Sequence, residues 1–189
     1  MLKNIIFEFK QSIKVFITML LLLGVLYTGL VTVIAELFFP FQAHGSLLYK
    51  DGKVMGSKLI AQKFSTDKFF EARPSAVDYN PMPSSGSNLG LGSKALNDLL
   101  QERRLISNDN PPQDLLTSSA SGLDPHISAD AAYYQMQKII NARNLNESQA
   151  TELKSLIEKH IEKRDLNILG EARINVLELN LEMDKLFNE

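Results

Sequence analysis

The sequence has 189 residues but contains no cysteine and only three histidines: His44, His126 and His160. The absence of cysteine excludes disulfides, thiolate nucleophiles, zinc fingers and iron–sulfur ligation by this chain. A metal site needs several His or carboxylate side chains that converge, and we expect none here. The chain also lacks a large excess of either charge, since 20 Lys and Arg stand against 22 Asp and Glu. A strongly basic nucleic-acid binder is therefore excluded, because few counterions would be released from a phosphate backbone.

Charge is also missing from one long stretch, residues 15–35, which read VFITMLLLLGVLYTGLVTVIA. A helix of this length spans roughly 31 Å, about the thickness of the hydrocarbon core of a bilayer. A buried core helix would normally show a polar face. A cleaved signal peptide would have a shorter apolar region followed by small residues, whereas bulky residues follow here at 38–41. We therefore predict an uncleaved transmembrane helix.

The charges beside this helix predict its orientation. Lys3, Lys10 and Lys14 precede it, and Glu36 lies just after it. Because positively charged flanks stay in the cytoplasm, we expect residues 1–14 to be cytoplasmic and the domain of residues 41–189 to be extracytoplasmic.

Small residues recur along one side of the predicted span. Gly24, Thr28 and Thr32 are spaced four residues apart, and Ala35 is nearby. Small residues at this spacing allow another helix to approach closely. Chance is the alternative, because Gly and Thr are common in membrane spans. If the face is real, the chain is a subunit of an assembly with more membrane helices.

The remaining residues predict a mixture of helices and strands. A strand or strand pair is expected in 54–64, followed by a loop rich in Pro, Gly and Ser over 73–93 and by a helix over 94–105 that is capped by Ser93 and ended by 108–112. A loop over 113–128 then leads to a helix over 129–143 capped by Ser128 and to a helix over 147–163 with an Asn146–Gln149 capping box. A strand is expected over 173–179, and the chain returns to helix from Leu181. The elements do not alternate regularly between strand and helix, which favours α+β. The predicted fold is a single N-terminal transmembrane helix plus a soluble α+β domain.

Two runs resemble sites for chemistry. The run GSNLGLGSK at 86–94 lacks the spacing of a phosphate-binding P-loop and has Ser before Lys, so a turn and a helix cap explain it better. The run SSASGLDPHIS at 118–128 offers Ser119, Ser121, Asp124 and His126. A Ser–His–Asp triad is usually assembled from distant segments. A turn at Asp124, with His126 satisfying a buried carbonyl, is therefore the favoured interpretation.

Two smaller features have structural interpretations. His160 falls on the apolar stripe of the helix predicted over 147–163, and we expect a half-buried imidazole whose nitrogens are hydrogen-bonded. The charged residues within 158–164 are interpreted as a solvated helix face with salt-bridge spacing.

Several blocks of the sequence match a known family. They are GSKLIAQKF at 56–64, FFEARPSAVDYNP at 69–81, SGSNLG at 85–90, DLLTSSASGLDPHIS at 114–128 and LGEARINVLELNLEMD at 169–184. With these blocks, the chain resembles the C subunit of the Kdp potassium-transporting ATPase, a bacterial P-type pump complex. One N-terminal span followed by an outer domain is also the layout of that family.

The resemblance singles out motif residues with structural or partner-contacting roles. They are Arg73, Pro74, Ser75, Gly86, Asn88, Gly90, Ser121, Gly122, Asp124, Pro125, His126, Ser128, Asn175 and Asn180. None of them is implied to be catalytic or to hold a cofactor.

The resemblance implies a non-catalytic accessory subunit in the bacterial plasma membrane. Its implied partners are a potassium-binding channel-like subunit, a P-type subunit that hydrolyses ATP, a small single-span subunit and the lipid bilayer. The complex uses ATP, magnesium and potassium. The family is also described as a catalytic chaperone that raises ATP affinity, and with an extracytoplasmic domain such an effect would be indirect coupling. The alternative is an independent, membrane-tethered outer hydrolase that uses His126 and Asp124.

Overall fold

The computed structural model describes residues 2–106 and 110–187, and side chains from Asn4 onward. The described chain divides into two compact units, with the division between Ser46 and Leu47. The predicted ending of a helix within 108–112 falls partly on residues outside the described ranges.

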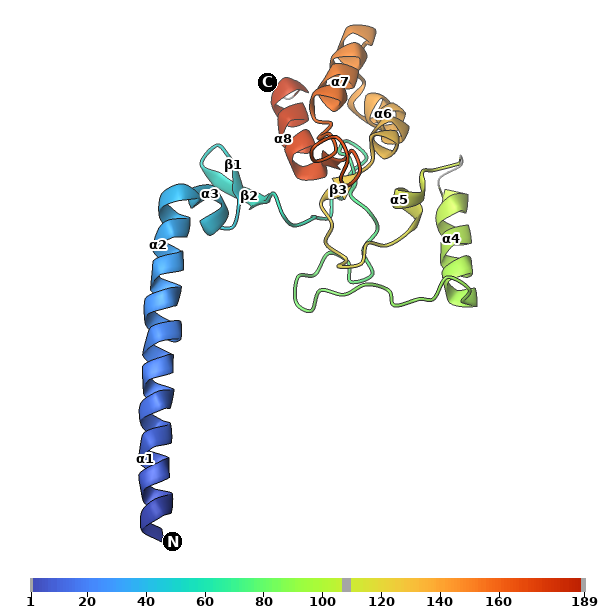
Figure 1. Cartoon of the computed structure of the whole chain (residues 1–189). Coiled ribbons are helices and arrows are strands. Elements are labelled where there is room, and N and C mark those ends of the chain that lie inside the picture. Colours follow the sequence, from blue (N-terminus) through green and yellow to red (C-terminus); the bar gives the residue numbers. More distant parts are fainter. Residues whose placement is uncertain (1, 107–109, 188–189) are drawn as a thin grey trace. The chain divides into compact units, whose positions relative to one another are not determined.

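The first unit is a single long helix followed by a short one (Figure 1). Its continuous part consists of α1 (Leu2–Met19), the π-helical stretch η1 (Leu20–Tyr27) and α2 (Thr28–Phe38). By length and composition, Asn4–Phe38 is able to cross a membrane, and it extends beyond the predicted 15–35 at both ends. A short helix, α3 (Pro40–Ala43), follows after a break imposed by Pro40.

The small-residue face of the span remains a prediction, but its hydroxyl groups are satisfied within the helix. Thr28 Oγ1 donates to the carbonyl of Leu23 at 2.9 Å, and Thr32 Oγ1 donates to the carbonyl of Thr28 at 2.9 Å. A neighbouring helix could therefore contact this face without leaving an unpaired donor in the membrane.

The second unit opens with an antiparallel hairpin of β1 (Leu47–Lys50) and β2 (Lys53–Ser57). Asp51 and Gly52 form its turn, and both have positive φ, as tight hairpin turns require. The strand predicted over 54–64 is therefore right only in its first part. Beyond β2 the chain turns, because Ser57 Oγ accepts the N–H of Leu59 at 3.1 Å.

Helix caps predicted from local sequence are confirmed. Ser93 caps α4 (Lys94–Ile106), Ser128 caps α6 (Ala129–Arg143), and the reciprocal capping box at Asn146 and Gln149 begins α7 (Glu147–Lys159). The prediction for α7 was too long, since this helix ends at Lys159 and not at residue 163.

Two predictions for the connecting segments were wrong. The predicted loop over 113–128 contains α5 (Gln113–Leu116) and β3 (His126–Ile127). The predicted strand over 173–179 is reduced to β4 (Ile174–Asn175), which pairs antiparallel with β3, and α8 (Val176–Phe187) begins immediately. Asn175 Oδ1 accepts the backbone N–H of Glu178 at 3.1 Å, which is the N-cap interaction that starts the helix.

The core of the second unit lies among α6, α7, α8 and the extended segment at 69–72. Its largest fully buried apolar side chains are Phe70, Ile127, Ile139, Leu153, Ile157, Ile174, Leu179 and Met183. The one-transmembrane-helix, α+β fold class predicted from the sequence is confirmed.

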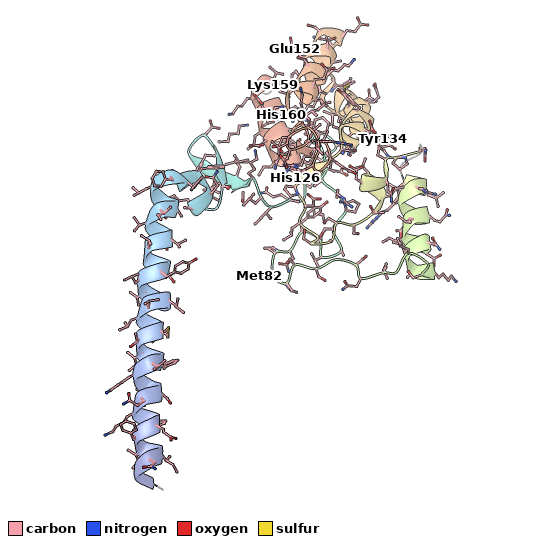
Figure 2. The ribbon with its side chains drawn as sticks, viewed as in Figure 1. Met82, His126, Tyr134, Glu152, Lys159 and His160 are labelled. Atoms are coloured by element: carbon pink, nitrogen blue, oxygen red, sulfur yellow. The ribbon has the colours of Figure 1, made fainter. Side chains whose placement is uncertain are left out.

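The charged helix face predicted over 158–164 is right only for residues 158 and 159, because α7 ends at Lys159. Glu162 lies beyond the helix and bonds to Arg173 Nε at 3.0 Å, while Lys159 reaches Glu182 on α8 at 2.7 Å. His160 is half-buried as predicted (Figure 2): its Nδ1 lies 2.9 Å from the carbonyl of Leu156 and its Nε2 lies 2.7 Å from Glu182. These contacts join α7 to α8.

Candidate functional site

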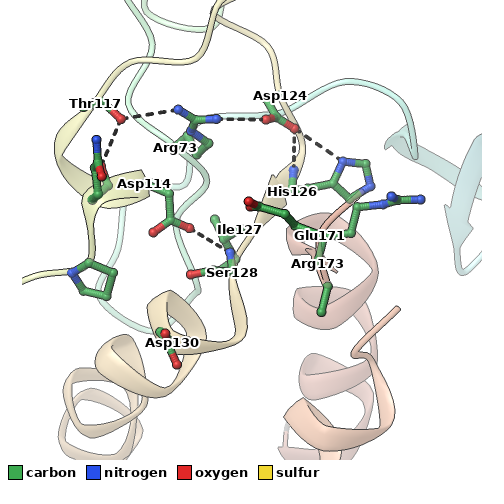
Figure 3. A pocket seen from close by; sticks show the side chains of 13 residues that line it. Arg73, Asp114, Thr117, Asp124, His126, Ile127, Ser128, Asp130, Glu171 and Arg173 are labelled. Carbon is green, nitrogen blue, oxygen red and sulfur yellow. Dashed lines mark hydrogen bonds and ion pairs between the residues drawn. The ribbon is translucent and has the colours of Figure 1, made fainter. Parts of the chain in front are cut away.

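An open pocket of about 800 Å³ lies beside the SASGLDPHIS run, α5 and residues 171–173, which directly precede β4 (Figure 3). It is lined by Arg73, Pro112, Gln113, Asp114, Thr117, Asp124, His126, Ile127, Ser128, Asp130, Glu171, Ala172 and Arg173. Four motif residues singled out by the family resemblance, at positions 73, 124, 126 and 128, are thus brought together.

Arg73 links three segments at the pocket wall (Figure 3). Its guanidinium lies 3.5 Å from Asp124 Oδ2 and donates to Thr117 Oγ1 at 3.3 Å. The Nε atom of Arg73 is buried and has no hydrogen-bond partner within the described ranges. Thr117 was not among the predicted site residues.

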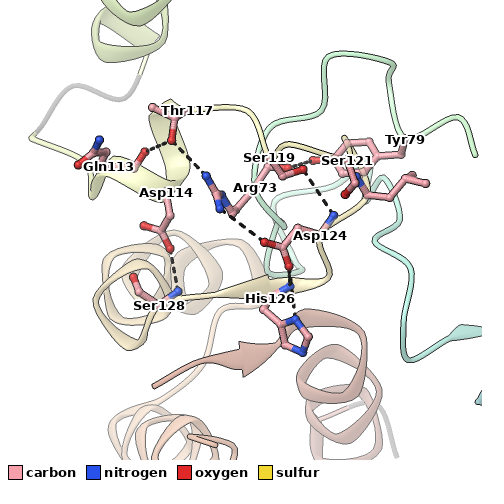
Figure 4. A network of polar contacts seen from close by, with 11 residues as sticks. Arg73, Tyr79, Gln113, Asp114, Thr117, Ser119, Ser121, Asp124, His126 and Ser128 are labelled. Atoms are coloured by element: carbon pink, nitrogen blue, oxygen red, sulfur yellow. Dashed lines mark hydrogen bonds and ion pairs between the residues drawn. The ribbon is translucent and has the colours of Figure 1, made fainter. Parts of the chain in front are cut away.

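Asp124 organises the turn ahead of β3 (Figure 4). One carboxylate oxygen accepts the backbone N–H of His126 at 3.0 Å and lies 3.3 Å from His126 Nδ1. Burial acts to raise the pKa of Asp124, but the His126 hydrogen bonds and the nearby positive charge of Arg73 outweigh it and hold the pKa below its ordinary value. The predicted turn is confirmed, whereas His126 faces this carboxylate and not a buried carbonyl.

The serine hydroxyls beside this pair have other partners. Ser121 Oγ accepts the N–H of Leu123 at 3.1 Å, and Ser128 Oγ accepts the N–H of Ala131 at 3.1 Å. Ser119 is buried, with its Oγ 3.5 Å from the N–H of Asp124. Across residues 2–106 and 110–187, no serine hydroxyl is hydrogen-bonded to the imidazole of His126, as a Ser–His–Asp triad would require. These serine contacts are those of a rigid turn.

A second missed residue ties the turn to the next helix. Asp114, on α5, accepts the backbone N–H of Ser128 at 2.7 Å, so the helix cap is itself held by a charged group (Figure 3). Its place in the DLLTSSASGLDPHIS block was a sequence signal that could have identified it.

Two glycines of the motif set allow two loops to touch. A Cβ atom at Gly86 would lie 2.7 Å from the carbonyl oxygen of Ala120, and one at Gly122 would lie 2.6 Å from the carbonyl oxygen of Ser85. Gly122 also has a φ of 71°. Any side chain would therefore push the 85–86 loop away from the 119–122 loop.

Further motif residues hold this loop pair in place. The carbonyl of Pro74 accepts the N–H of Ser119 at 3.2 Å, and Ser75 Oγ accepts the N–H of Tyr79 at 2.9 Å. Tyr79 donates its hydroxyl to the carbonyl of Arg73 at 3.0 Å, and burial, with the charges of nearby acids, raises its pKa to about 12. The phenol therefore stays neutral and keeps donating.

Buried side-chain amides make backbone hydrogen bonds of the kind that a neighbouring strand would make in a sheet. Asn180 on α8 accepts the N–H of Phe70 and donates to its carbonyl, both at 2.8 Å. Gln135 on α6 makes the same pair of bonds with Glu71, at 2.8 and 3.1 Å. Asn175 donates to the carbonyl of Lys58 at 2.8 Å. The extended segment carrying Arg73 is thereby fixed from both sides.

The remaining motif residues lie apart from the pocket lining. Pro125 contributes its carbonyl, which accepts the N–H of Val176 at the start of α8. Asn88 has a φ of 54°, and the carbonyl of Gly90 accepts the N–H of Ser93 at 2.9 Å. The GSNLGLGSK run is thus a turn and a helix cap, as predicted. Among the described residues, no group of three His, Asp or Glu side chains could hold a metal ion.

Comparison with known proteins agrees with these motifs. Residues 9–185 match the model of a family described as K+-transporting ATPase, c chain. Proteins named potassium-transporting ATPase KdpC subunit are similar to this chain. The one from Caldanaerobacter subterraneus subsp. tengcongensis is 42% identical over 184 residues, covering 93% of this chain and 94% of the relative. The one from Methylococcus capsulatus is 43% identical over 189 residues, covering 95% and 98%.

A third relative, from Herpetosiphon aurantiacus, is 44% identical over 188 residues and covers 94% of this chain and 96% of its own length. The matched region includes the long apolar helix as well as the domain that carries the pocket. The resemblance seen in the sequence motifs is confirmed, and the chain belongs to the family of potassium-transporting ATPase C chains.

Proposed function

We propose that this chain is a non-catalytic accessory subunit of an ATP-driven potassium importer, which it helps to assemble and stabilise from the outer side of the membrane. The observation that carries the proposal is the extent of the family match, which runs over residues 9–185 and includes both the apolar helix and the domain. The relatives are named as subunits of a potassium-transporting ATPase.

The chemistry of the pocket supports a structural role. Asp124 contacts Arg73, the imidazole of His126 and the backbone N–H of His126, and neighbouring hydroxyls serve as caps and turn acceptors. Such a network fixes the relative positions of three chain segments. We infer that it forms a rigid platform for contact with the channel-like subunit near the potassium entrance.

The helix supplies the second contact in this proposal. Its N-terminus lies in the cytoplasm, and the face of Gly24, Thr28, Thr32 and Ala35 packs against membrane helices of the channel-like or small single-span subunit. The P-type subunit binds ATP and magnesium on the opposite side of the membrane. Any effect of this chain on ATP affinity is then coupling through the complex.

Purification of the complex with and without this chain tests the proposal. We expect the affinity-tagged chain to co-purify with the channel-like and ATP-hydrolysing subunits, and potassium-stimulated ATP hydrolysis to fall when the chain is omitted. A complex that assembles fully and keeps its potassium-stimulated activity without the chain would contradict an accessory role.

The contact of His126 with Asp124 is the one observation that favours an independent hydrolase. In that case His126→Ala would abolish hydrolysis of a soluble ester by the purified chain, while His44→Ala in the first unit would not. In the subunit interpretation the purified chain has no such activity to lose. His126→Ala then leaves the complex assembled, or weakens it.

A further inference from the structure

The hairpin at the start of the second unit exposes an unusual amount of apolar surface. We define the hairpin patch as the exposed large apolar side chains of the hairpin and of the segment just after the hairpin. These are Tyr49, Val54, Met55, Leu59 and Ile60, with exposed fractions of 58, 54, 42, 62 and 39%. They fall within only twelve residues of chain, so exposed apolar side chains are dense along this segment.

Two members of the patch form a cross-strand pair. Tyr49 lies directly opposite Val54 in the antiparallel register, so both side chains project from one face of the ladder. A two-stranded sheet with one apolar face open to water is marginally stable. We therefore expect another apolar surface, either lipid or protein, to cover this face.

The opposite side of the hairpin is already attached to its own unit. Lys50 is paired with Asp184 of α8, and Gln62 donates to the carbonyl of Met55 at 2.9 Å. Asp184 also accepts from Arg143 at 3.3 Å. The hairpin is thus held by polar contacts to the domain, and these contacts do not cover Tyr49 and Val54.

The covalent chain limits how far the hairpin can be from the membrane. The apolar helix ends at Phe38 and β1 begins at Leu47. Nine residue steps cover at most about 30 Å when fully extended, and the helical Pro40–Ala43 shortens that reach. A bilayer adds a headgroup layer several ångströms thick on each side of its core. The hairpin is therefore within reach of the lipid headgroups.

The residue types of the hairpin suit this layer. Tyr is enriched at the membrane–water interface, where its ring meets apolar chains and its hydroxyl meets water. Val54, the cross-strand partner of Tyr49, adds apolar surface on the same face of the ladder.

We propose that the hairpin patch lies in the headgroup layer of the bilayer, with Tyr49 and Val54 against the upper acyl chains. The proposal depends on the proposed function only in requiring that residues 15–35 span the membrane. It adds a second, monotopic contact that holds the outer domain against the lipid surface.

The absence of tryptophan from this chain provides a clean test. The full chain with Tyr49→Trp is placed in nanodiscs of phosphatidylethanolamine and phosphatidylglycerol, with or without bromine, which is placed near the headgroup end of the acyl chains for the hairpin positions and near their terminal methyl groups for the helix position. We expect blue-shifted emission and loss of most of the fluorescence in brominated lipid. Val54→Trp on the same face repeats the measurement in case one substitution disturbs folding.

Two control positions separate the outcomes. Leu26→Trp in the apolar helix reports insertion, and Leu91→Trp, at a side chain that is 94% exposed, reports a position in water. Quenching at 26, 49 and 54 but not at 91 supports the proposal. Quenching at 26 alone overturns it while leaving the span intact, and absence of quenching at 26 contradicts the membrane-anchored function itself.

A protein partner is the competing occupant of the hairpin patch. If the indole introduced by Tyr49→Trp is unquenched by brominated lipid but becomes protected from aqueous acrylamide when the other subunits are added, the patch is a protein interface and the lipid proposal is wrong.

Discussion

At the scale of single residues, Asn180 makes two buried hydrogen bonds that join α8 to the extended segment at 69–72. Its amide satisfies both backbone groups of Phe70, and both residues are buried. Asn180→Ala leaves a buried N–H and a buried carbonyl without partners, and we expect a loss of about 3 kcal/mol in the free energy of unfolding. Urea titration of the full chain in detergent, followed by tyrosine near-UV circular dichroism, measures this loss.

Asn97 provides the matched control for that experiment, because it is exposed on α4. Asn97→Ala removes an equal side chain and adds a better helix former, so stability is expected to stay the same or rise slightly. Equal urea midpoints for the two variants would show that the bonds of Asn180 contribute little.

Asp124 gives a pH dependence at the same scale. Its pKa is held below the ordinary value of 3.8 in the folded chain, so ionised Asp124 stabilises the fold above that value, and the stabilisation is lost as the pH falls through the folded-state pKa. Asp124→Asn keeps an acceptor for the N–H of His126 but removes the charge. We expect a stability loss of about 1 kcal/mol at pH 7, discounted for partial exposure.

That difference should narrow as the pH falls below 3.8 and disappear only below the lowered folded-state pKa of the carboxylate. Unfolding of wild type and Asp124→Asn by urea at pH 7, 5 and 3 provides the measurement. A stability gap that stays constant over this range would mean that turn geometry, and not charge, is what Asp124 contributes.

At the scale of elements, local signals were predictable and distant ones were not. The caps at Ser93 and Ser128 and the capping box at Asn146 depend on residues within one turn, and each was identified from sequence. Asn175 and Glu178 have the same N-cap spacing. At these positions the β-branched residues Ile174 and Val176 led to the prediction of a strand. The buried residues 176, 177, 179, 180 and 183 nevertheless recur with a helical period.

The candidate site shows the same limit more strongly. Arg73 meets Asp124 across 51 positions of sequence, and Gln135 holds Glu71 across 64. No local pattern specifies such pairs, because either side chain could be satisfied by water or by a neighbour. The family motifs identified Arg73 and Asp124 without showing that they touch, and nothing in the sequence identified Gln135.

The apolar helix carries an element-scale prediction about assembly. Replacing Gly24 and Thr28 together with Leu adds bulk to the proposed packing face without making the helix less apolar. We expect the chain to remain in the membrane but to be lost from the other subunits on affinity purification in detergent. Val33→Phe, which adds bulk on the opposite side of the helix, is expected to co-purify normally.

Unchanged co-purification of the Gly24→Leu, Thr28→Leu double variant would leave the recurrence of small residues as a chance feature. Loss of co-purification in Val33→Phe as well would mean that bulk anywhere on the helix is harmful, and the assignment of one face would fail.

At the scale of the whole molecule, the proposed accessory role depends on which side of the membrane the second unit occupies. Lys10 and Lys14 precede the apolar run and no basic residue follows it closely, so translocation of the N-terminal flank is disfavoured. Because the chain has no cysteine, single cysteines at position 12 or 91 can report sidedness without background. Both Ser12 and Leu91 have exposed side chains.

We expect a membrane-impermeant maleimide added to spheroplasts to label Leu91→Cys, and to label Ser12→Cys only after the membrane is opened by detergent. The opposite pattern would place the pocket and the hairpin in the cytoplasm. The domain could then contact the ATP-hydrolysing subunit directly, and coupling to ATP affinity would need no transmission across the membrane. Sidedness therefore decides between an outer platform for the channel-like subunit and a direct partner of the ATP site.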